Sequence, residues 1–196
     1  MGQASVARHK LGTSPALSTG LTAMQRIVIS DAGPLIALAR IGQLELLPGL
    51  FGKVSVTELV VNEITLGGVF PDTASLLQAL QQPWLETVPM TELLLAQCSD
   101  WVNLHQIDMG EASALVLARQ SMAQGDEVLV IVDEARGRMA AAHAHIAVTG
   151  TAGLLVLAKN LGLLPAVQPL LLALQLQEYF LSERLLQAVL RQAGEG

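Results

Sequence analysis

The chain has 196 residues, of which 52% are hydrophobic, 3% aromatic and 14% charged, and its net charge is −6. This composition predicts one aliphatic-cored domain with tails, and it excludes a disordered chain. The net charge argues against an extended, sequence-reading DNA-binding surface. A membrane span is not predicted, because the sequence contains no run of about 18 uninterrupted apolar residues.

The first 24 residues show no hydrophobic period and predict a flexible N-terminal extension. A first strand is expected over Ile27–Ser30, because this apolar, β-branched run is typical of a strand buried on both faces. The strand runs directly into Asp31. Gly33 and Pro34 then open a helix that extends to Arg40, since proline is favourable in a first turn.

Shorter elements follow. Leu44–Phe51 predicts a short helix or turn and Val54–Val56 a brief strand, after which Thr57 is placed to cap a further helix. That helix is expected over 58–66, with the glycines at 67 and 68 as its stop signal. The pattern then predicts a helix over 73–82, an extended segment over 84–88 and a helix over 91–99.

A strongly helical pattern covers Gly110–Met122, and Gly125 and Asp126 turn the chain into a second long strand over Val128–Val132. This strand also runs into acidic residues, Asp133 and Glu134. The remaining elements are expected to be a helix over 134–143, a strand over 146–148, a helix over 151–161 and two amphipathic helices from 167 to the end.

This alternation of strands and helices predicts an α/β fold, a three-layer α/β/α sandwich around a mostly parallel sheet. The core domain is expected over 25–165, with a C-terminal helical extension over 166–196 packed on it. The single cysteine, Cys98, excludes an internal disulfide framework, and no secretory signal is visible. We therefore expect a soluble, cytoplasmic protein.

Asp31 and Asp133 each follow one of the two long strands. Ligands of open α/β sheets bind at the carboxyl ends of the strands, so both carboxylates are candidates for a site there. As an alternative, either aspartate can be the N-cap of the helix that follows.

Two glutamates occupy unexpected positions on helices. Glu63 is predicted on the apolar stripe of its helix, and Glu111 has Leu115 and Ala118 on the same face. A buried carboxylate must be paired, protonated or bound to metal. The alternatives are a Glu63 side chain that reaches solvent, and a purely structural capping box formed by Asp108 and Glu111.

A group of three or four acids predicts a cation site, because two carboxylates 4 Å apart repel by about 4 kcal/mol near a protein surface. All-oxygen ligation favours Mg²⁺ or Mn²⁺ over zinc, and no histidine has a zinc-ligand spacing. The hydroxyls of Thr149 and Thr151 are placed to line the same crevice, with capping as the alternative role of Thr151.

The combination resembles the PIN-domain nucleases, in a branch often catalogued as a domain of unknown function. The resemblance runs from Arg26 to Leu164, with a weaker echo in the C-terminal helices. It rests on segments that match in order and spacing: Ser30-Asp31-Ala32-Gly33-Pro34-Leu35, Val61-Asn62-Glu63-Ile64, Asp108-x-Gly110-Glu111-Ala112, Val132-Asp133-Glu134-Ala135-Arg136 and Val148-Thr149-Gly150-Thr151-Ala152-Gly153.

This resemblance implies a catalytic quartet of Asp31, Glu63, Glu111 and Asp133. Asp31, Glu111 and Asp133 would hold Mg²⁺ or Mn²⁺, and Glu63 would orient the attacking water. Toxin-type members have aspartate where this chain has Glu111. They often carry a further acid or asparagine near the strand that ends at Thr149, where this chain has none.

The implied activity is metal-dependent hydrolysis of single-stranded RNA, in a toxin paired with a small antitoxin protein. The nearest basic candidates for phosphate contact are Arg136, Arg138 and Lys159. The amphipathic C-terminal helices and the high aliphatic content are compatible with a homodimer. The alternative is a PIN-like nucleic-acid or protein interaction module with little or no nuclease activity. A response-regulator-like phosphatase is disfavoured because the D-x-D signature is absent.

Overall fold

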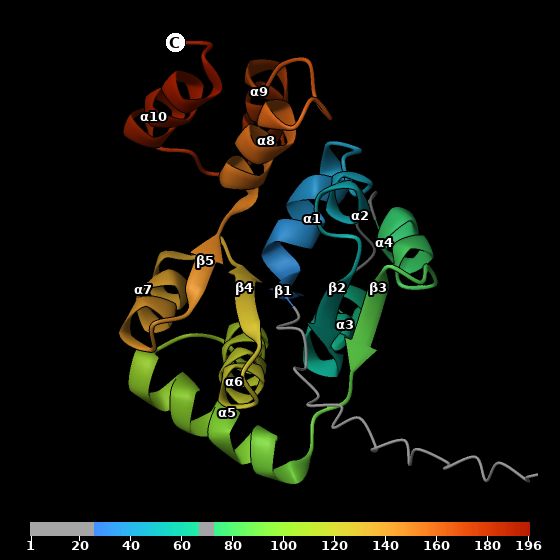
Figure 1. Ribbon diagram of the computed structural model, residues 1–196, viewed down its shortest axis with the longest axis vertical. Helices are drawn as coiled ribbons and strands as arrows, with labels where there is room; N and C mark the ends of the chain where they lie inside the picture. Colours follow the sequence, from blue (N-terminus) through green and yellow to red (C-terminus); the bar gives the residue numbers. More distant parts are fainter. Residues whose placement is uncertain (1–25, 67–72) are drawn as a thin grey trace, which may run out of the picture.

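A computed structural model describes residues 26–66 and 73–196, and its centre is one sheet of five parallel strands (Figure 1). The strand order is β3-β2-β1-β4-β5, so the two strands that precede Asp31 and Asp133 are neighbours. The predicted parallel α/β/α arrangement is confirmed. The strands are β1 (Arg26–Ser30), β2 (Val54–Thr57), β3 (Leu85–Val88), β4 (Glu127–Ile131) and β5 (Ala147–Thr149).

The predicted flexible extension over 1–24 and the predicted glycine stop at 67 and 68 lie outside the described residues. Ten helices are present in the described part, close to the ranges that the sequence predicts. They are α1 (Ala32–Arg40), α2 (Leu46–Phe51), α3 (Glu58–Leu66), α4 (Thr73–Ala79), α5 (Glu92–His105), α6 (Met109–Ala123), α7 (Ala135–His143), α8 (Thr151–Asn160), α9 (Gln168–Leu176) and α10 (Glu183–Ala193).

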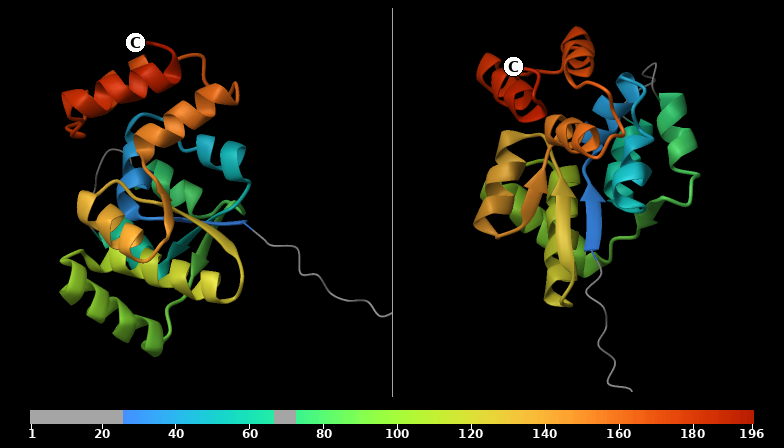
Figure 2. Two further views of the ribbon diagram at one scale, coloured as in Figure 1. Left: turned by 60° about the vertical axis from the view of Figure 1, so that its left-hand side comes forward. Right: turned by 45° about the horizontal axis from the view of Figure 1, so that its top comes forward.

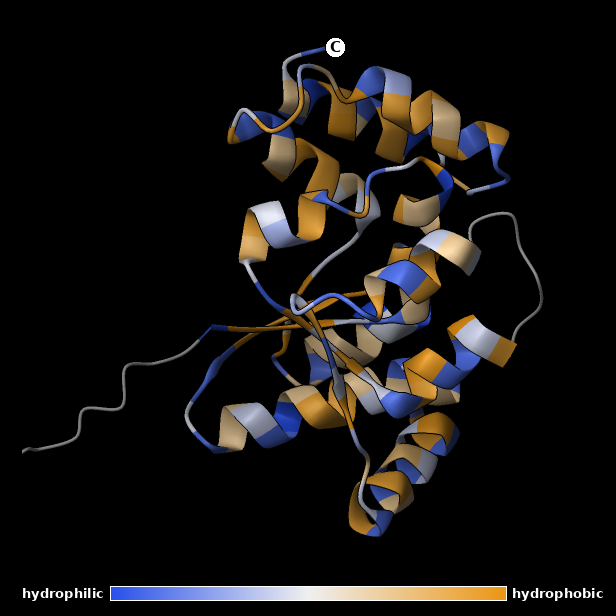
Figure 3. Ribbon diagram, turned by 90° about the vertical axis from the view of Figure 1, so that its right-hand side faces the viewer, coloured by the Kyte–Doolittle hydropathy of each residue, from blue (hydrophilic) through white to orange (hydrophobic). Residues whose placement is uncertain are grey.

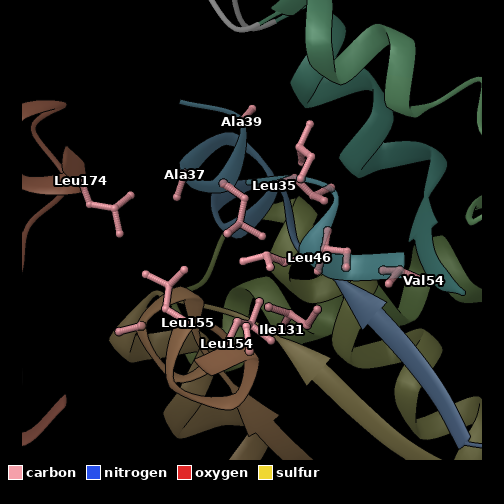
Figure 4. Packing of buried hydrophobic residues seen from close by; sticks show 14 of the residues in the cluster. Leu35, Ala37, Ala39, Leu46, Val54, Ile131, Leu154, Leu155 and Leu174 are labelled. Atoms are coloured by element: carbon pink, nitrogen blue, oxygen red, sulfur yellow. The ribbon is translucent and has the colours of Figure 1, made fainter. Parts of the chain in front are cut away.

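Side chains alternate across the sheet and build a separate core on each face. Val28 and Ile131 point into the core shared with α1 and α8, where Leu35 and Leu154 are fully buried (Figure 4). Ile29, Val128, Val130 and Val132 point to the opposite face, toward α5, α6 and α7. Burial of the central strands on both faces explains their continuous apolar sequences.

The central strands are mostly hydrophobic, whereas the helices carry both hydrophobic and hydrophilic residues (Figure 3). Helix α6 lies in the interior, with every residue from Gly110 to Ala118 buried. The N-terminus of α6 lies beside Asp31, at the carboxyl end of β1. Among the described residues, no helix combines the length and the apolar character that crossing a bilayer requires.

The two C-terminal helices pack against the α1 and α8 side of the sheet (Figure 2). Leu171 of α9 and Val189 of α10 belong to the same core as the central strands. Glu195 fastens the end of the chain there. Its carboxylate accepts hydrogen bonds from Lys159 at 2.6 Å and from the backbone N–H of Val167 at 2.7 Å.

One helix boundary differs clearly from the sequence-based prediction. Helix α5 continues to His105 instead of ending near Ser99, because Trp101 is buried and extends the apolar face by a turn. The helix ends at Gln106, whose left-handed φ of 55° is a C-terminal capping conformation.

Candidate metal centre

The first acid of the site is Asp31, at the junction of β1 and α1. Its backbone N–H donates to the carbonyl of Ile131 at 3.0 Å, which continues the pairing of β1 with β4. The residue occupies the N-cap position, but its side chain makes no capping hydrogen bond. Asp31 is only 5% exposed, and its Oδ1 atom has no hydrogen-bond partner among the described residues. The capping alternative therefore does not explain this carboxylate.

Three carboxylates converge at this point. Asp31, Glu63 of α3 and Asp108 each offer an oxygen, and these oxygens lie within 4.8 Å of one another. We call these three residues the acidic triad. The sequence did not predict Asp108 as a ligand, because the D-x-x-E pattern offers it a role as a helix cap. The signal for a second role is that Asp108 lies two residues before Gly110, a glycine in the first turn of a helix.

Gly110 provides the space around which the acidic triad is arranged. A methyl group at this position would lie 2.5 Å from Glu63 Oε2, 3.3 Å from Asp108 Oδ1 and 3.4 Å from Asp31 Oδ1. A side chain here would therefore occupy the space that the three carboxylates face. Glycine in D-x-G-E is explained by this close approach and not by helix propensity, which would favour alanine.

The placement of Glu63 corrects one expectation. The residue is exposed and does not lie on the buried stripe of α3, which consists of Val60 and Ile64. The Glu63 carboxylate is thus an exposed member of the acidic triad, whereas Asp31 is its buried member. Partial burial and the charge of Asp108 raise the pKa of Glu63.

The electrostatics of the triad favour a bound cation or a proton. Burial, with smaller contributions from the charges of Asp108, Glu63 and Glu111, raises the pKa of Asp31 to about 8, although a hydrogen bond from the Ala32 backbone acts in the opposite direction. Oxygen atoms of acidic side chains are the donors that Mg²⁺ and Mn²⁺ prefer. Such an ion fits the buried Oδ1 atom of Asp31, which has no hydrogen-bond partner among the described residues, and the space beside Gly110.

Glu111 is buried as expected, but it is not one of the three converging carboxylates. It forms the predicted capping box with Asp108: its N–H donates to Asp108 Oδ1 at 2.8 Å, and its Oε2 accepts from the Asp108 N–H at 3.4 Å. Its other oxygen, Oε1, has no hydrogen-bond partner in the described part of the chain and faces Gly137, where a methyl group would collide with it. Burial and the charge of Asp108 raise the pKa of Glu111 to about 7.

Asp133 is held by the protein at both of its carboxylate oxygens. Oδ1 accepts from the Thr151 N–H at 2.8 Å, and Oδ2 accepts from the Thr151 hydroxyl at 2.6 Å. Asp133 thus does not cap the helix after it, as the alternative interpretation proposed. It binds the first turn of α8, whose N-cap is Gly150, so the predicted cap Thr151 is the first residue inside the helix.

Asp31 and Asp133 nevertheless face one cavity of about 400 Å³. Arg40, Glu134 and Tyr179 also line it. The Tyr179 hydroxyl lies next to Asp133 and Thr151, and burial together with the Asp133 charge raises the pKa of Tyr179. The cavity therefore joins the carboxyl ends of β1 and β4, where the parallel sheet places them.

The predicted substrate-contact residues have different surroundings. Arg138 lines a second cavity of about 360 Å³ with Thr149, and its guanidinium donates to the Val132 carbonyl at 3.1 Å. Arg136 is exposed and donates to the Gln106 carbonyl at 3.1 Å. Lys159 lies in neither of these cavities and is bound by Glu195, so its contacts favour a structural role.

Comparison with known protein families gives one match that covers most of the chain. A family model described as a PIN domain, one of the families of unknown function, matches residues 27–195. No curated protein matches the chain. The matched range includes the acidic triad, both cavities and the two C-terminal helices.

Proposed function

The chain belongs to the PIN-domain family, which has a nuclease-type fold, and from this premise we propose that it is a metal-dependent endoribonuclease acting on single-stranded RNA. One observation carries the proposal. A buried aspartate at the carboxyl end of a central strand has an oxygen without a partner within 26–66 and 73–196, and that oxygen faces two further carboxylates around a glycine. This set of donors is suited to a divalent cation.

The acidic triad of Asp31, Glu63 and Asp108 would hold Mg²⁺ or Mn²⁺. When bound, such an ion activates a water molecule and neutralises charge that develops on a scissile phosphodiester. This assignment differs from the ligand set that the family resemblance implies, because it includes Asp108 and places Glu111 and Asp133 outside the cluster.

Glu111 and Asp133 would then be positioning residues. Glu111 fixes Asp108 through the reciprocal hydrogen bonds of the capping box. Asp133 fixes the first turn of α8 through Thr151, and it contributes negative charge to the cavity wall. Its partly exposed carboxylate also lies where a substrate that fills the cavity would contact it.

The test is cleavage of a mixed single-stranded RNA with Mn²⁺ by the full chain and by the Asp31→Asn variant. We expect cleavage by the wild type only, because asparagine removes the charge with little change of shape. Glu127→Gln is the matched control, since Glu127 is an exposed acid on β4 paired with Arg26. Absence of cleavage by a wild-type protein that binds Mn²⁺ would overturn the nuclease proposal.

A binding measurement on the same proteins examines the alternative of an interaction module. The net charge of −6 favours a basic partner over a long nucleic acid. RNA or protein binding without any cleavage would support that alternative. The pairing with a small antitoxin stays a prediction from the family resemblance.

A further inference from the structure

The segment between α9 and α10 forms a wall between the two cavities at the acidic edge of the sheet. Tyr179 and Phe180 line the cavity that contains Asp31, and they also line the cavity that contains Asp133, Arg138 and Gly150. A polymer that passes from one cavity to the other must therefore cross these two aromatic residues.

Hydrogen bonds hold the backbone of this segment before Phe180, and a buried side chain follows it. The Tyr179 N–H donates to the Leu174 carbonyl at 3.1 Å, and Arg40 donates to the Gln177 carbonyl at 3.2 Å. The Tyr179 side chain is half-buried beside Asp133, and Leu181 is buried in the first core. The position of Phe180 is thus fixed by its neighbours.

Phe180 itself is 88% exposed, although most large apolar side chains of the described part are buried. The other described aromatic residues are buried or half-buried: Phe51, Trp84, Trp101 and Tyr179. An exposed ring on an anchored segment gains free energy when another planar group covers it. Nucleic-acid bases supply such a group, since every base has a π-face.

We propose that Phe180 is the stacking platform for one unpaired base of the substrate, next to the phosphate that enters the acidic cavity. This inference rests on the proposed function, and it names the feature of the substrate that the site recognises: a single-stranded nucleotide whose base is free to stack.

The charge balance of the chain supports this assignment. With 11 Lys and Arg against 17 Asp and Glu, phosphate attraction alone supplies little affinity for RNA. Stacking on an aromatic ring does not depend on net charge and tolerates any base sequence. Arg138, in the second cavity, provides one cation beyond the ring.

The experiment uses the full chain in EDTA, where metal-dependent cleavage does not occur. The probes are short single-stranded RNAs with 2-aminopurine at successive positions, and the readouts are fluorescence quenching and affinity by anisotropy. We expect quenching at one position in the wild type, and binding by Phe180→Leu that is roughly tenfold weaker and lacks this quenching. Phe180→Trp should retain both signals.

Two controls separate stacking from general effects. Leu176→Ala removes another exposed apolar side chain, 83% exposed and outside both cavities, and should bind like the wild type. An abasic site at the quenched position should abolish the difference between the wild type and Phe180→Leu.

Equal affinity and quenching in the wild type and Phe180→Leu would overturn the proposal, as would a wild type that binds none of the probes. A change of oligomeric state in Phe180→Leu with unchanged RNA binding would also overturn it and would identify Phe180 as a protein contact. Stacking by a wild type that does not cleave RNA with Mn²⁺ would contradict the proposed activity alone.

Discussion

The carboxylate of Asp133 is bound at both oxygens by one residue, Thr151, at 2.8 Å from its backbone nitrogen and at 2.6 Å from its hydroxyl. Asp31 follows the neighbouring strand in the same way, yet none of the residues that the structure describes donates a hydrogen bond to its Oδ1. Two aspartates with equivalent positions in the sequence pattern thus have different chemistry. The one that the protein leaves unsatisfied is the candidate ligand.

We expect Thr151→Val to destabilise the protein by about 1–3 kcal/mol, because it removes a hydrogen bond to a carboxylate at a fully buried position. Urea unfolding measures the change. Thr151→Ser should recover most of the lost stability, and Thr87→Val, at an exposed position of β3, should change it by no more than about 0.5 kcal/mol. If Thr151→Val leaves the free energy of unfolding unchanged, the contact with Asp133 does not contribute to stability.

We expect Gly110→Ala to weaken Mn²⁺ binding by about ten- to hundredfold while the protein stays folded. The added methyl group would displace the flexible end of Glu63 from the acidic triad. Gly33→Ala is the matched control, since its methyl group would lie at an ordinary 3.7 Å from Asp31 Oδ2. Calorimetric titration with Mn²⁺ checks both variants, and equal affinities would contradict the placement of the ion beside Gly110.

The stability of the metal-free protein should depend on pH through Asp31. Its pKa is raised from 3.8 to about 8, so between these values the folded protein retains a proton that the unfolded chain has released. Stability from this group is therefore full below about pH 4 and is lost as the pH rises towards 8.

Asp31→Asn removes this titration, because asparagine stays neutral. In EDTA, the unfolding free energy of the variant relative to that of the wild type should rise steadily from pH 5 to about pH 8. Urea unfolding at several pH values measures this difference. A difference that does not vary with pH would show that Asp31 is already ionised in the folded protein.

Glu195 should stabilise the C-terminal helices in a pH-dependent way. Its hydrogen bonds with Lys159, Val167 and Gln168 hold its pKa at about 2, below the ordinary 4.5. Its contribution is therefore present above pH 4.5 and lost as the pH falls towards 2.

Glu195→Gln should accordingly lower the thermal midpoint at pH 7 and change it much less at pH 3. The control is Glu127→Gln, because the exposed pair of Glu127 with Arg26 is of a kind that contributes little. Equal effects of Glu195→Gln at both pH values would contradict an ionic contact.

Much of the fold was predictable because its strands are buried on both faces and read as continuous apolar runs. The order of helices and strands follows from these runs, and it places Asp31 and Asp133 at the same edge. The end of α5 was not predictable, since Trp101 adds a turn only through packing against distant residues.

The candidate site was predictable in its elements and not in its ligand set. Asp108 looked like a complete structural cap, and only the fold shows that its carboxylate also faces Asp31 and Glu63. The exposure of Glu63 was only the alternative interpretation of the sequence, for a related reason. A helical stripe does not specify whether its edge meets solvent or another helix.

The most direct test of the acidic triad is calorimetric titration of Mn²⁺ into Asp108→Asn. Asparagine caps helices as well as aspartate does, so this change keeps the N-terminus of α6 and removes only the charge. If the triad holds the ion, affinity should fall at least about tenfold from that of the wild type, with an unchanged thermal midpoint. Binding of Mn²⁺ equal to that of the wild type would contradict the account and leave Asp108 as a helix cap alone.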